Sequence, residues 1–140
     1  GVTLHVRVAG DPATKRVLVA IHGGPGMASD YMLSLEQSAG KDLAVVTYDQ
    51  RGTGRSTAPS DGYAMDRYVE DLEAVRETLG AARIYLFGHS WGGVVAQRRD
   101  AGGEPGTGLP LGSQRHGIEQ LSARRVSDQQ HFLDAALIEQ

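Results

Sequence analysis

The sequence predicts an α/β fold with a mostly parallel sheet and flanking helices, and three observations favour it. Short runs of β-branched and aliphatic residues occupy positions 16–21, 43–48 and 84–87. Such runs are typical of strands that are covered on both faces. Each run is followed at once by a glycine-rich loop and then by a segment with helical features. A strand–loop–helix unit repeated in this way favours parallel strands joined by helical crossovers.

The remaining elements follow from residue periodicity. Residues 2–9 alternate apolar and polar and predict a strand with one wet face, on which His5 lies. Helices are expected over 29–39, 65–79 and 91–99. In the second helix, one face carries Met65, Tyr68, Val69, Leu72, Val75 and Leu79. We interpret the acidic residues Glu70, Asp71, Glu73 and Glu77 as the solvated face of that helix.

The chain divides at residue 97. Residues 1–97 carry the strand and helix patterns, whereas 98–117 hold six glycines and two prolines and predict a loop. A last helix is expected from Ser127, with Phe132, Leu133, Ala136 and Leu137 on one face. The change in composition motivates the hypothesis that residues 98–140 are an out-of-frame extension or come from a mis-assembled gene model.

Composition excludes several classes of protein. The apolar fraction of 40% is enough for one core, and the longest apolar run, Val17–Ile21, has five residues, too few to cross a bilayer. A net charge of −3 without clustered Lys and Arg argues against nucleic acid binding. The chain has no cysteine, which fits a reducing compartment, so we expect a cytoplasmic protein. We expect no cofactor and no metal, since no histidine pair has metal-ligand spacing with a carboxylate.

One motif points to a nucleophile. Gly88-His89-Ser90-Trp91-Gly92 is a Gly-x-Ser-x-Gly sequence between a predicted buried strand and a predicted helix. A serine on such a sharp turn projects its hydroxyl outward, and the amide of the next residue, Trp91, points at the reacting centre. The alternative is a glycine–serine turn without chemistry.

A second donor for an oxyanion should come from another loop at the same sheet edge. The loop His22-Gly23-Gly24-Pro25-Gly26 follows the first buried run, and Gly24 is the expected donor. A phosphate-binding loop is the rival interpretation, but no Gly-Lys-Ser/Thr follows. We interpret Met27, Tyr31, Met32 and Tyr48 as core or pocket wall, His22 as bonded to backbone in its own loop, and His89 as a packing residue.

Together with Asp49-Gln50-Arg51-Gly52-x-Gly54-x-Ser56 and the closing Gly92-Gly93 pair, these motifs resemble the α/β-hydrolase fold family, and within it the proline iminopeptidase group. The resemblance covers about residues 1–97. It implies that Ser90 is the nucleophile, that the Gly24 and Trp91 amides form the oxyanion hole, and that Asp49 and Arg51 brace the oxyanion loop. It also implies a serine aminopeptidase that releases N-terminal proline from a small peptide.

The sequence departs from the family after residue 97. The resemblance implies a triad acid and histidine on later strands, a helical cap domain and a first hairpin strand, and we expect all of these to be absent. The tail offers a conceivable substitute triad from His116 or His131 with Asp100, Asp128 or Asp134.

Two other functions stay open. One is another hydrolase of this fold, acting on an ester, lactone or amide. The other is a non-catalytic fragment that binds a partner. Because the 84–87 strand would be left as an apolar edge, self-association through that edge is expected.

Overall fold

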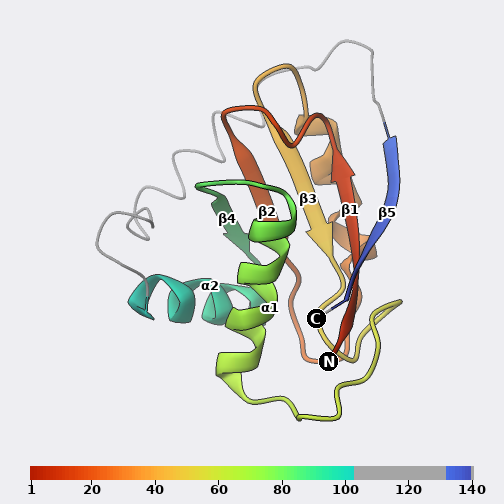
Figure 1. The fold of residues 1–140 in the computed structure, drawn as a ribbon, viewed down its shortest axis with the longest axis vertical. Helices are drawn as coiled ribbons and strands as arrows, with labels where there is room; N and C mark the ends of the chain where they lie inside the picture. The colour runs from red at the N-terminus through yellow and green to blue at the C-terminus, as the bar shows by residue number, and fades with distance from the viewer. Residues whose placement is uncertain (103–131, 140) are drawn as a thin grey trace.

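The computed structural model describes residues 1–102 and 132–139. Its elements in chain order are β1 (Thr3–Ala9), β2 (Val17–Ile21), the 3-10 helix η1 (Ser29–Ser38), β3 (Ala44–Tyr48), α1 (Met65–Thr78), β4 (Tyr85–Gly88), α2 (Trp91–Gly102) and β5 (Phe132–Glu139) (Figure 1). All the elements predicted within residues 1–97 are present.

The sheet has the order β4-β2-β3-β1-β5. Strand β2 pairs in parallel with both β3 and β4, whereas β1 is antiparallel to β3 and to β5. The predicted mostly parallel α/β arrangement is therefore confirmed. The strands that precede the three glycine loops are neighbours, and their carboxyl ends lie at the same edge of the sheet.

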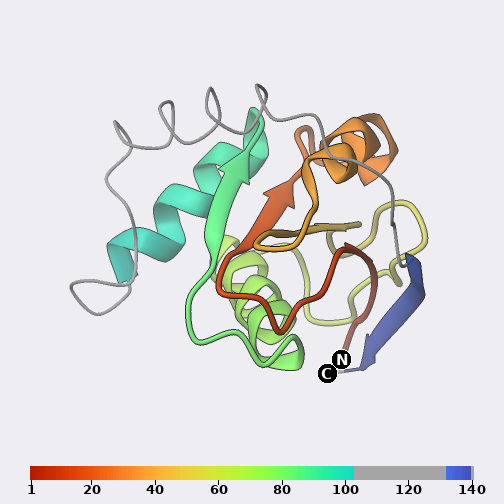
Figure 2. The same ribbon diagram turned by 90° about the horizontal axis from the view of Figure 1, so that it is seen from above.

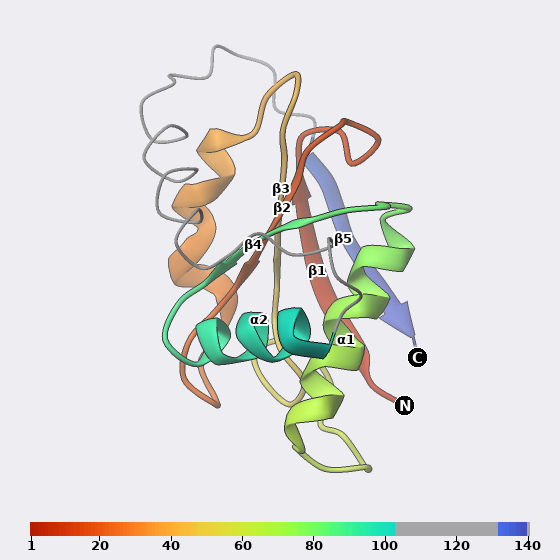
Figure 3. The same cartoon turned by 90° about the vertical axis from the view of Figure 1, so that its left-hand side faces the viewer.

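Helices cover both faces of the central strands. On one face, Val19 and Ile21 of β2 belong to a core cluster that includes Leu72 of α1 and Val95 of α2. On the other face, the core cluster contains Leu18, Val45, Ala39 and Leu43, with Leu35 of η1 packed against it. Figure 3 shows η1 on the side opposite α1 and α2. The continuous apolar runs are thus explained by burial on both faces.

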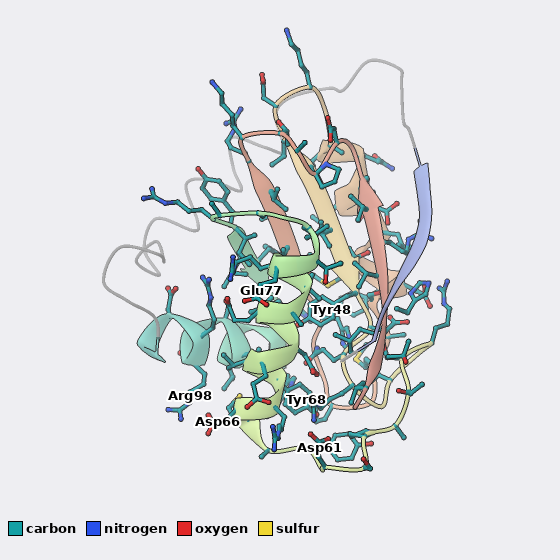
Figure 4. All side chains as sticks on the ribbon, viewed as in Figure 1. Tyr48, Asp61, Asp66, Tyr68, Glu77 and Arg98 are labelled. Atoms are coloured by element: carbon teal, nitrogen blue, oxygen red, sulfur yellow. The ribbon has the colours of Figure 1, made fainter. Side chains whose placement is uncertain are left out.

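Helix α2 extends to Gly102, so residues 100–102, beyond the predicted helix end at 99 and within the predicted loop, are helical. Two residues near this end of α2 form ion pairs with α1. Arg99 Nε lies 2.7 Å from Glu73 Oε1, and Arg98 Nη2 lies 2.9 Å from Asp66 Oδ1 (Figure 4). These ion pairs join α2 to α1 at residues 98 and 99.

The helix predicted from Ser127 is wrong over 132–139, where the structure has strand β5. This strand lies along the outer side of β1, with Thr3 paired to Glu139 and Ala9 paired to Phe132 (Figure 2). Pairing satisfies backbone groups along β1 that would otherwise form an open edge, and such tertiary pairing overrides local helical periodicity. Residues 127–131 lie outside the described ranges.

Strand β1 also differs from its prediction. His5, expected on a wet face, is only 6% exposed, because the loop after β3 covers it. The His5 backbone N–H donates to Ser56 Oγ at 2.9 Å, and the Asp49 N–H donates to the His5 carbonyl at 2.9 Å. The apolar–polar alternation of β1 therefore does not show that the loop after β3 covers His5.

Across residues 1–102 and 132–139, every helix is too short or too polar to reach from one side of a bilayer to the other.

The outer edge of β4 predicts self-association. Among the described strands, β4 has a partner only on its β2 side, and Tyr85 is 42% exposed. We expect the sedimentation coefficient to rise with protein concentration, and Tyr85→Lys to weaken this rise because a charge on an edge strand opposes strand pairing.

The matched control is Thr78→Lys, which adds the same charge at an exposed position on α1. It should leave the concentration dependence unchanged. A wild-type chain that stays monomeric at the highest concentration tested would contradict the prediction.

Candidate active site

Three loops meet at the carboxyl edge of β2, β3 and β4, at the lower end of the sheet in Figure 1. The first and third loops are in direct contact. The His89 N–H donates to the Ile21 carbonyl at 3.0 Å, which continues the β2–β4 pairing into the turn. A methyl group on Gly23 would lie 2.7 Å from His89 Nδ1 and 3.1 Å from Ser90 Cβ, so only glycine fits here. The sequence-predicted residues of both loops are thus brought together.

Ser90 occupies the predicted sharp turn between β4 and α2. Its φ of +52° makes it the one non-glycine residue with positive φ in the described part of the chain. The turn is closed by hydrogen bonds of 2.9 Å from Gly92 N–H to the His89 carbonyl and from Gly93 N–H to the Ser90 carbonyl. A side chain in this conformation costs about 1–2 kcal/mol, and such strain clusters at functional sites. Ser90 is exposed, so its hydroxyl is accessible.

The glycines on either side of Ser90 are required by close packing. A Cβ on Gly92 would collide with the Ile21 carbonyl at the end of β2. A Cβ on Gly88 would lie 2.5 Å from the Gly92 carbonyl oxygen and the Gly93 nitrogen. The spacing of the motif therefore lets the start of α2 approach both β4 and β2.

The backbone amides near this turn that are without an acceptor within residues 1–102 and 132–139 include Trp91 N–H, at the first residue of α2, and Gly24 N–H in the first loop. The Ser90 and Gly26 N–H groups are likewise without an acceptor in these residues. The neighbouring Gly23 N–H instead donates to the Tyr31 hydroxyl at 2.6 Å. The open amides thus include the two that the sequence predicts as oxyanion donors, and a helix N-terminus favours a nearby negative charge.

His22 joins the first loop to the second. Its Nε2 accepts the Gln50 N–H at 2.9 Å, so the ring proton sits on Nδ1, which donates to the Gly23 carbonyl at 3.0 Å. Gln50 Nε2 also donates to the His22 carbonyl at 2.7 Å. Burial lowers the pKa of His22, although the bond to Gly23 opposes this, and the ring is held neutral. The predicted bond within its own loop is present, and the link to Gln50 adds to it.

Asp49 joins the second loop to the start of η1. Its Oδ1 accepts hydrogen bonds from the Ser29 N–H at 2.8 Å and the Ser29 hydroxyl at 2.7 Å, and its Oδ2 accepts the Arg55 N–H at 2.9 Å. Burial alone would raise the pKa of Asp49, but these bonds outweigh it and lower the pKa below its usual value. Asp49 therefore fixes the start of η1, which directly follows the first glycine loop, and Ser29 is the partner that sequence reasoning missed.

Arg51 contacts helix α1 and its preceding loop. Its guanidinium makes two 2.7 Å hydrogen bonds to the Asp71 carboxylate, one of 3.1 Å to Asp61 and one of 3.0 Å to the Gly62 carbonyl. The bond to Asp71 is the main reason that the pKa of Arg51 is raised. Arg51 therefore fixes the β3 loop against α1, and it contacts the first glycine loop only indirectly.

Asp71, predicted on the solvated face of α1, is 1% exposed. The signal was present in the spacing, because Asp71 lies three residues after Tyr68 and four before Val75 and so shares the apolar face. A carboxylate on such a face needs a charged partner.

Trp91 and His89, the residues on either side of Ser90, each contact a tyrosine. The Trp91 ring packs edge-on against Tyr68, with centroids 5.6 Å apart. His89 is exposed, and its Nδ1 lies 2.8 Å from the Tyr31 hydroxyl oxygen. Tyr31, predicted as core or pocket wall, thus contacts both loops. His116, Asp128 and His131 lie outside the described residues, and the substitute triad stays untested.

Breaking the Arg51–Asp71 pair should strongly destabilise the fold. Asp71→Asn leaves a buried guanidinium without its main partner, and we expect the free energy of unfolding to fall by about 3 kcal/mol in urea titrations. The double variant Arg51→Met with Asp71→Leu should recover most of the loss, since neither charge is then left alone. A loss below about 0.5 kcal/mol for Asp71→Asn would show that the pair does not hold the loop.

The strained backbone at Ser90 predicts that a substitution by glycine stabilises the fold. Ser90→Gly should raise the free energy of unfolding by about 1 kcal/mol, because glycine adopts positive φ without steric cost. Ser90→Ala should leave stability unchanged, since alanine keeps the strain. As a matched control, Ser34→Gly in η1 should destabilise by about 1 kcal/mol. Equal effects of glycine at positions 90 and 34 in thermal or urea unfolding would contradict a strained turn.

With this geometry in place, the chain can be compared with known proteins. A sequence model of the alpha/beta hydrolase fold matches residues 16–98. The proline iminopeptidase of Lactobacillus helveticus is 39% identical over 100 residues, which cover 69% of this chain and 34% of that protein. The chain therefore spans about a third of the length of the curated relatives it matches.

Solved structures of similar proteins have the same fold over the matched part of the chain. The crystal structure of proline iminopeptidase from Mycobacterium smegmatis is similar, with a TM-score of 0.64 and 32% identity over 74% of this chain and 38% of that chain. A structure from work on carboxylesterases of the thaumarchaeon Nitrososphaera gargenis has a TM-score of 0.64 and 27% identity, over 77% of this chain and 39% of that chain. The resemblance inferred from the three motifs is confirmed.

Proposed function

This chain belongs to the α/β-hydrolase fold family, and on that premise we propose that it carries the nucleophile and oxyanion hole of a serine hydrolase of the proline iminopeptidase type. One observation above all supports the proposal: Ser90 sits exposed in a positive-φ turn, is followed by the open Trp91 amide and packs against Gly23 of the first glycine loop. The similarity to proline iminopeptidases over about 100 residues supports the choice of an N-terminal prolyl group as substrate.

In the proposed reaction, Ser90 Oγ attacks the carbonyl carbon of the N-terminal proline. The carbonyl oxygen gains negative charge, and the Gly24 and Trp91 amides stabilise it by hydrogen bonding. Collapse of the tetrahedral intermediate breaks the C–N bond, releases the rest of the peptide as an amine and leaves an acyl-serine, which water then hydrolyses. The serine proton must pass through a base to the leaving amine.

Among residues 1–102 and 132–139, no histidine ring is hydrogen-bonded to Ser90 Oγ. His89 Nδ1 contacts Tyr31, His22 is bonded to Gln50 and Gly23, and His5 Nδ1 lies 3.6 Å from Asp49 Oδ2. For a serine hydrolase without acid and base, acceleration from binding and the oxyanion hole is about 10³–10⁴ over water. We expect the described residues by themselves to accelerate the hydrolysis of prolyl substrates to about that level.

A second candidate function is ester hydrolysis by the same serine. It is favoured by the likeness to the Nitrososphaera gargenis structure and by chemistry, since an ester's leaving group needs less help from an acid than an amine does. A cytoplasmic location is part of the proposal and is supported by the absence of cysteine.

Covalent labelling of Ser90 tests the proposed site. A fluorophosphonate probe should label the wild-type chain slowly, because the oxyanion hole assists attack without a base, and Ser90→Ala should abolish labelling because the attacking oxygen is gone. Ser34→Ala, an exposed serine on η1, is the matched control and should label like wild type. Intact-mass and peptide mass spectrometry measure both the extent and the position of the adduct.

The outcomes separate the functions. Adduct at Ser90 together with release of proline from a prolyl amide supports the aminopeptidase, whereas adduct with turnover of an aryl ester alone supports the second candidate. No adduct at Ser90 under conditions where the chain is folded would identify an inert fragment and overturn the proposal.

A further inference from the structure

We propose that Tyr31 is a positioning residue, which holds the first glycine loop against the Ser90 turn through its hydroxyl group. Tyr31 lies in the first turn of η1, outside all three glycine motifs. Its consequence for catalysis rests on the proposed function, whereas the contact itself can be tested without any reaction.

The hydroxyl of Tyr31 connects two loops at once. Its oxygen accepts the Gly23 N–H at 2.6 Å and lies 2.8 Å from His89 Nδ1. Because the oxygen accepts from Gly23, its own proton is free to be donated, and His89 Nδ1 is the acceptor within reach. The Tyr31 and His89 rings also meet edge-on, with centroids 5.4 Å apart, so the two side chains are in ring contact as well.

This arrangement occupies one amide of the first loop and leaves the next one open. Gly23 N–H is consumed by Tyr31, while Gly24 N–H is left without an acceptor in the described part of the chain. The same hydroxyl holds His89, the residue before Ser90, so the loop and the turn keep a fixed relation. Without the hydroxyl, the Gly23 amide would compete for a negative charge at the site and the loop could rotate.

Tyr31 is in turn anchored to the second loop. Two residues earlier, the Ser29 N–H and hydroxyl both donate to Asp49 Oδ1, which pins the start of η1. The first turn of η1 therefore joins all three loops, through Asp49 to the second, Gly23 to the first and His89 to the third. A core or pocket-wall tyrosine would not need its hydroxyl for this, and Tyr31 is 43% exposed.

The test uses the full ¹⁵N-labelled chain and the substitution Tyr31→Phe, which removes only the hydroxyl. We expect hydrogen exchange at the Gly23 amide to become about tenfold faster, since one net hydrogen bond is lost. The His89 Nδ1 resonance should also shift as its donor disappears. Tyr85→Phe is the matched control, because Tyr85 is equally exposed at 42% and lies in β4, and it should change neither signal.

A double-mutant cycle with His89→Ala, read by the rate of fluorophosphonate labelling, connects the contact to Ser90. We expect each single variant to slow labelling several-fold and the double variant to be no slower than Tyr31→Phe alone, because the two side chains act as one unit. Fully additive effects would overturn the role of the Tyr31–His89 contact.

The two proposals fail separately. If the wild-type chain is not labelled, the proposed function fails, while Gly23 exchange and the His89 resonance still decide the role of Tyr31. If Tyr31→Phe is folded by circular dichroism and leaves both signals unchanged, the positioning role is wrong whatever Ser90 does. If Tyr31→Phe unfolds, the Tyr31 hydroxyl does more than position the loops, and the proposal is also wrong.

Discussion

The parallel pairing of β2 with β3 and β4 is the constraint on which the site depends. In this register Ile21, the last residue of β2, pairs with both Tyr48 and Gly88, the last residues of its neighbours. The three strands therefore end at one level, and their loops start side by side. Burial on both faces fixes the register, because a slip by one residue would exchange the side chains that face α1 and η1.

Parallel strands bring the loops together, but polar contacts set their conformations. A neutral His22 joins the first loop to the second, the Asp49 carboxylate joins the second to η1, and Arg51 joins the second to α1 through Asp71. These groups are buried, so each partner satisfies a group that would be costly to leave alone. The Ser90 turn, by contrast, is strained, and the surrounding contacts maintain it.

The sequence predicts the features that depend on residues close together along the chain. Apolar runs predict the central strands, and the glycines around Ser90 predict the turn, because the same short-range sterics operate in any fold. The features that it does not predict depend on contacts between residues far apart in the sequence. Asp71 and Arg51 are 20 residues apart, Tyr31 and His89 are 58 apart, and strand β5 forms because β1 has an edge to pair. Only for Asp71 did a local signal exist, in its position on the apolar face of α1.

The central claim is that the Gly24 and Trp91 amides together receive the negative charge formed on addition to Ser90. An arylboronic acid, which adds to a serine hydroxyl as an anionic tetrahedral adduct, tests it most directly when titrated into ¹⁵N-labelled chain. Both amide resonances should shift along one saturation curve, and Ser90→Ala should abolish the shifts. Shifts confined to other amides, shifts that persist in Ser90→Ala, or none at saturation would contradict it.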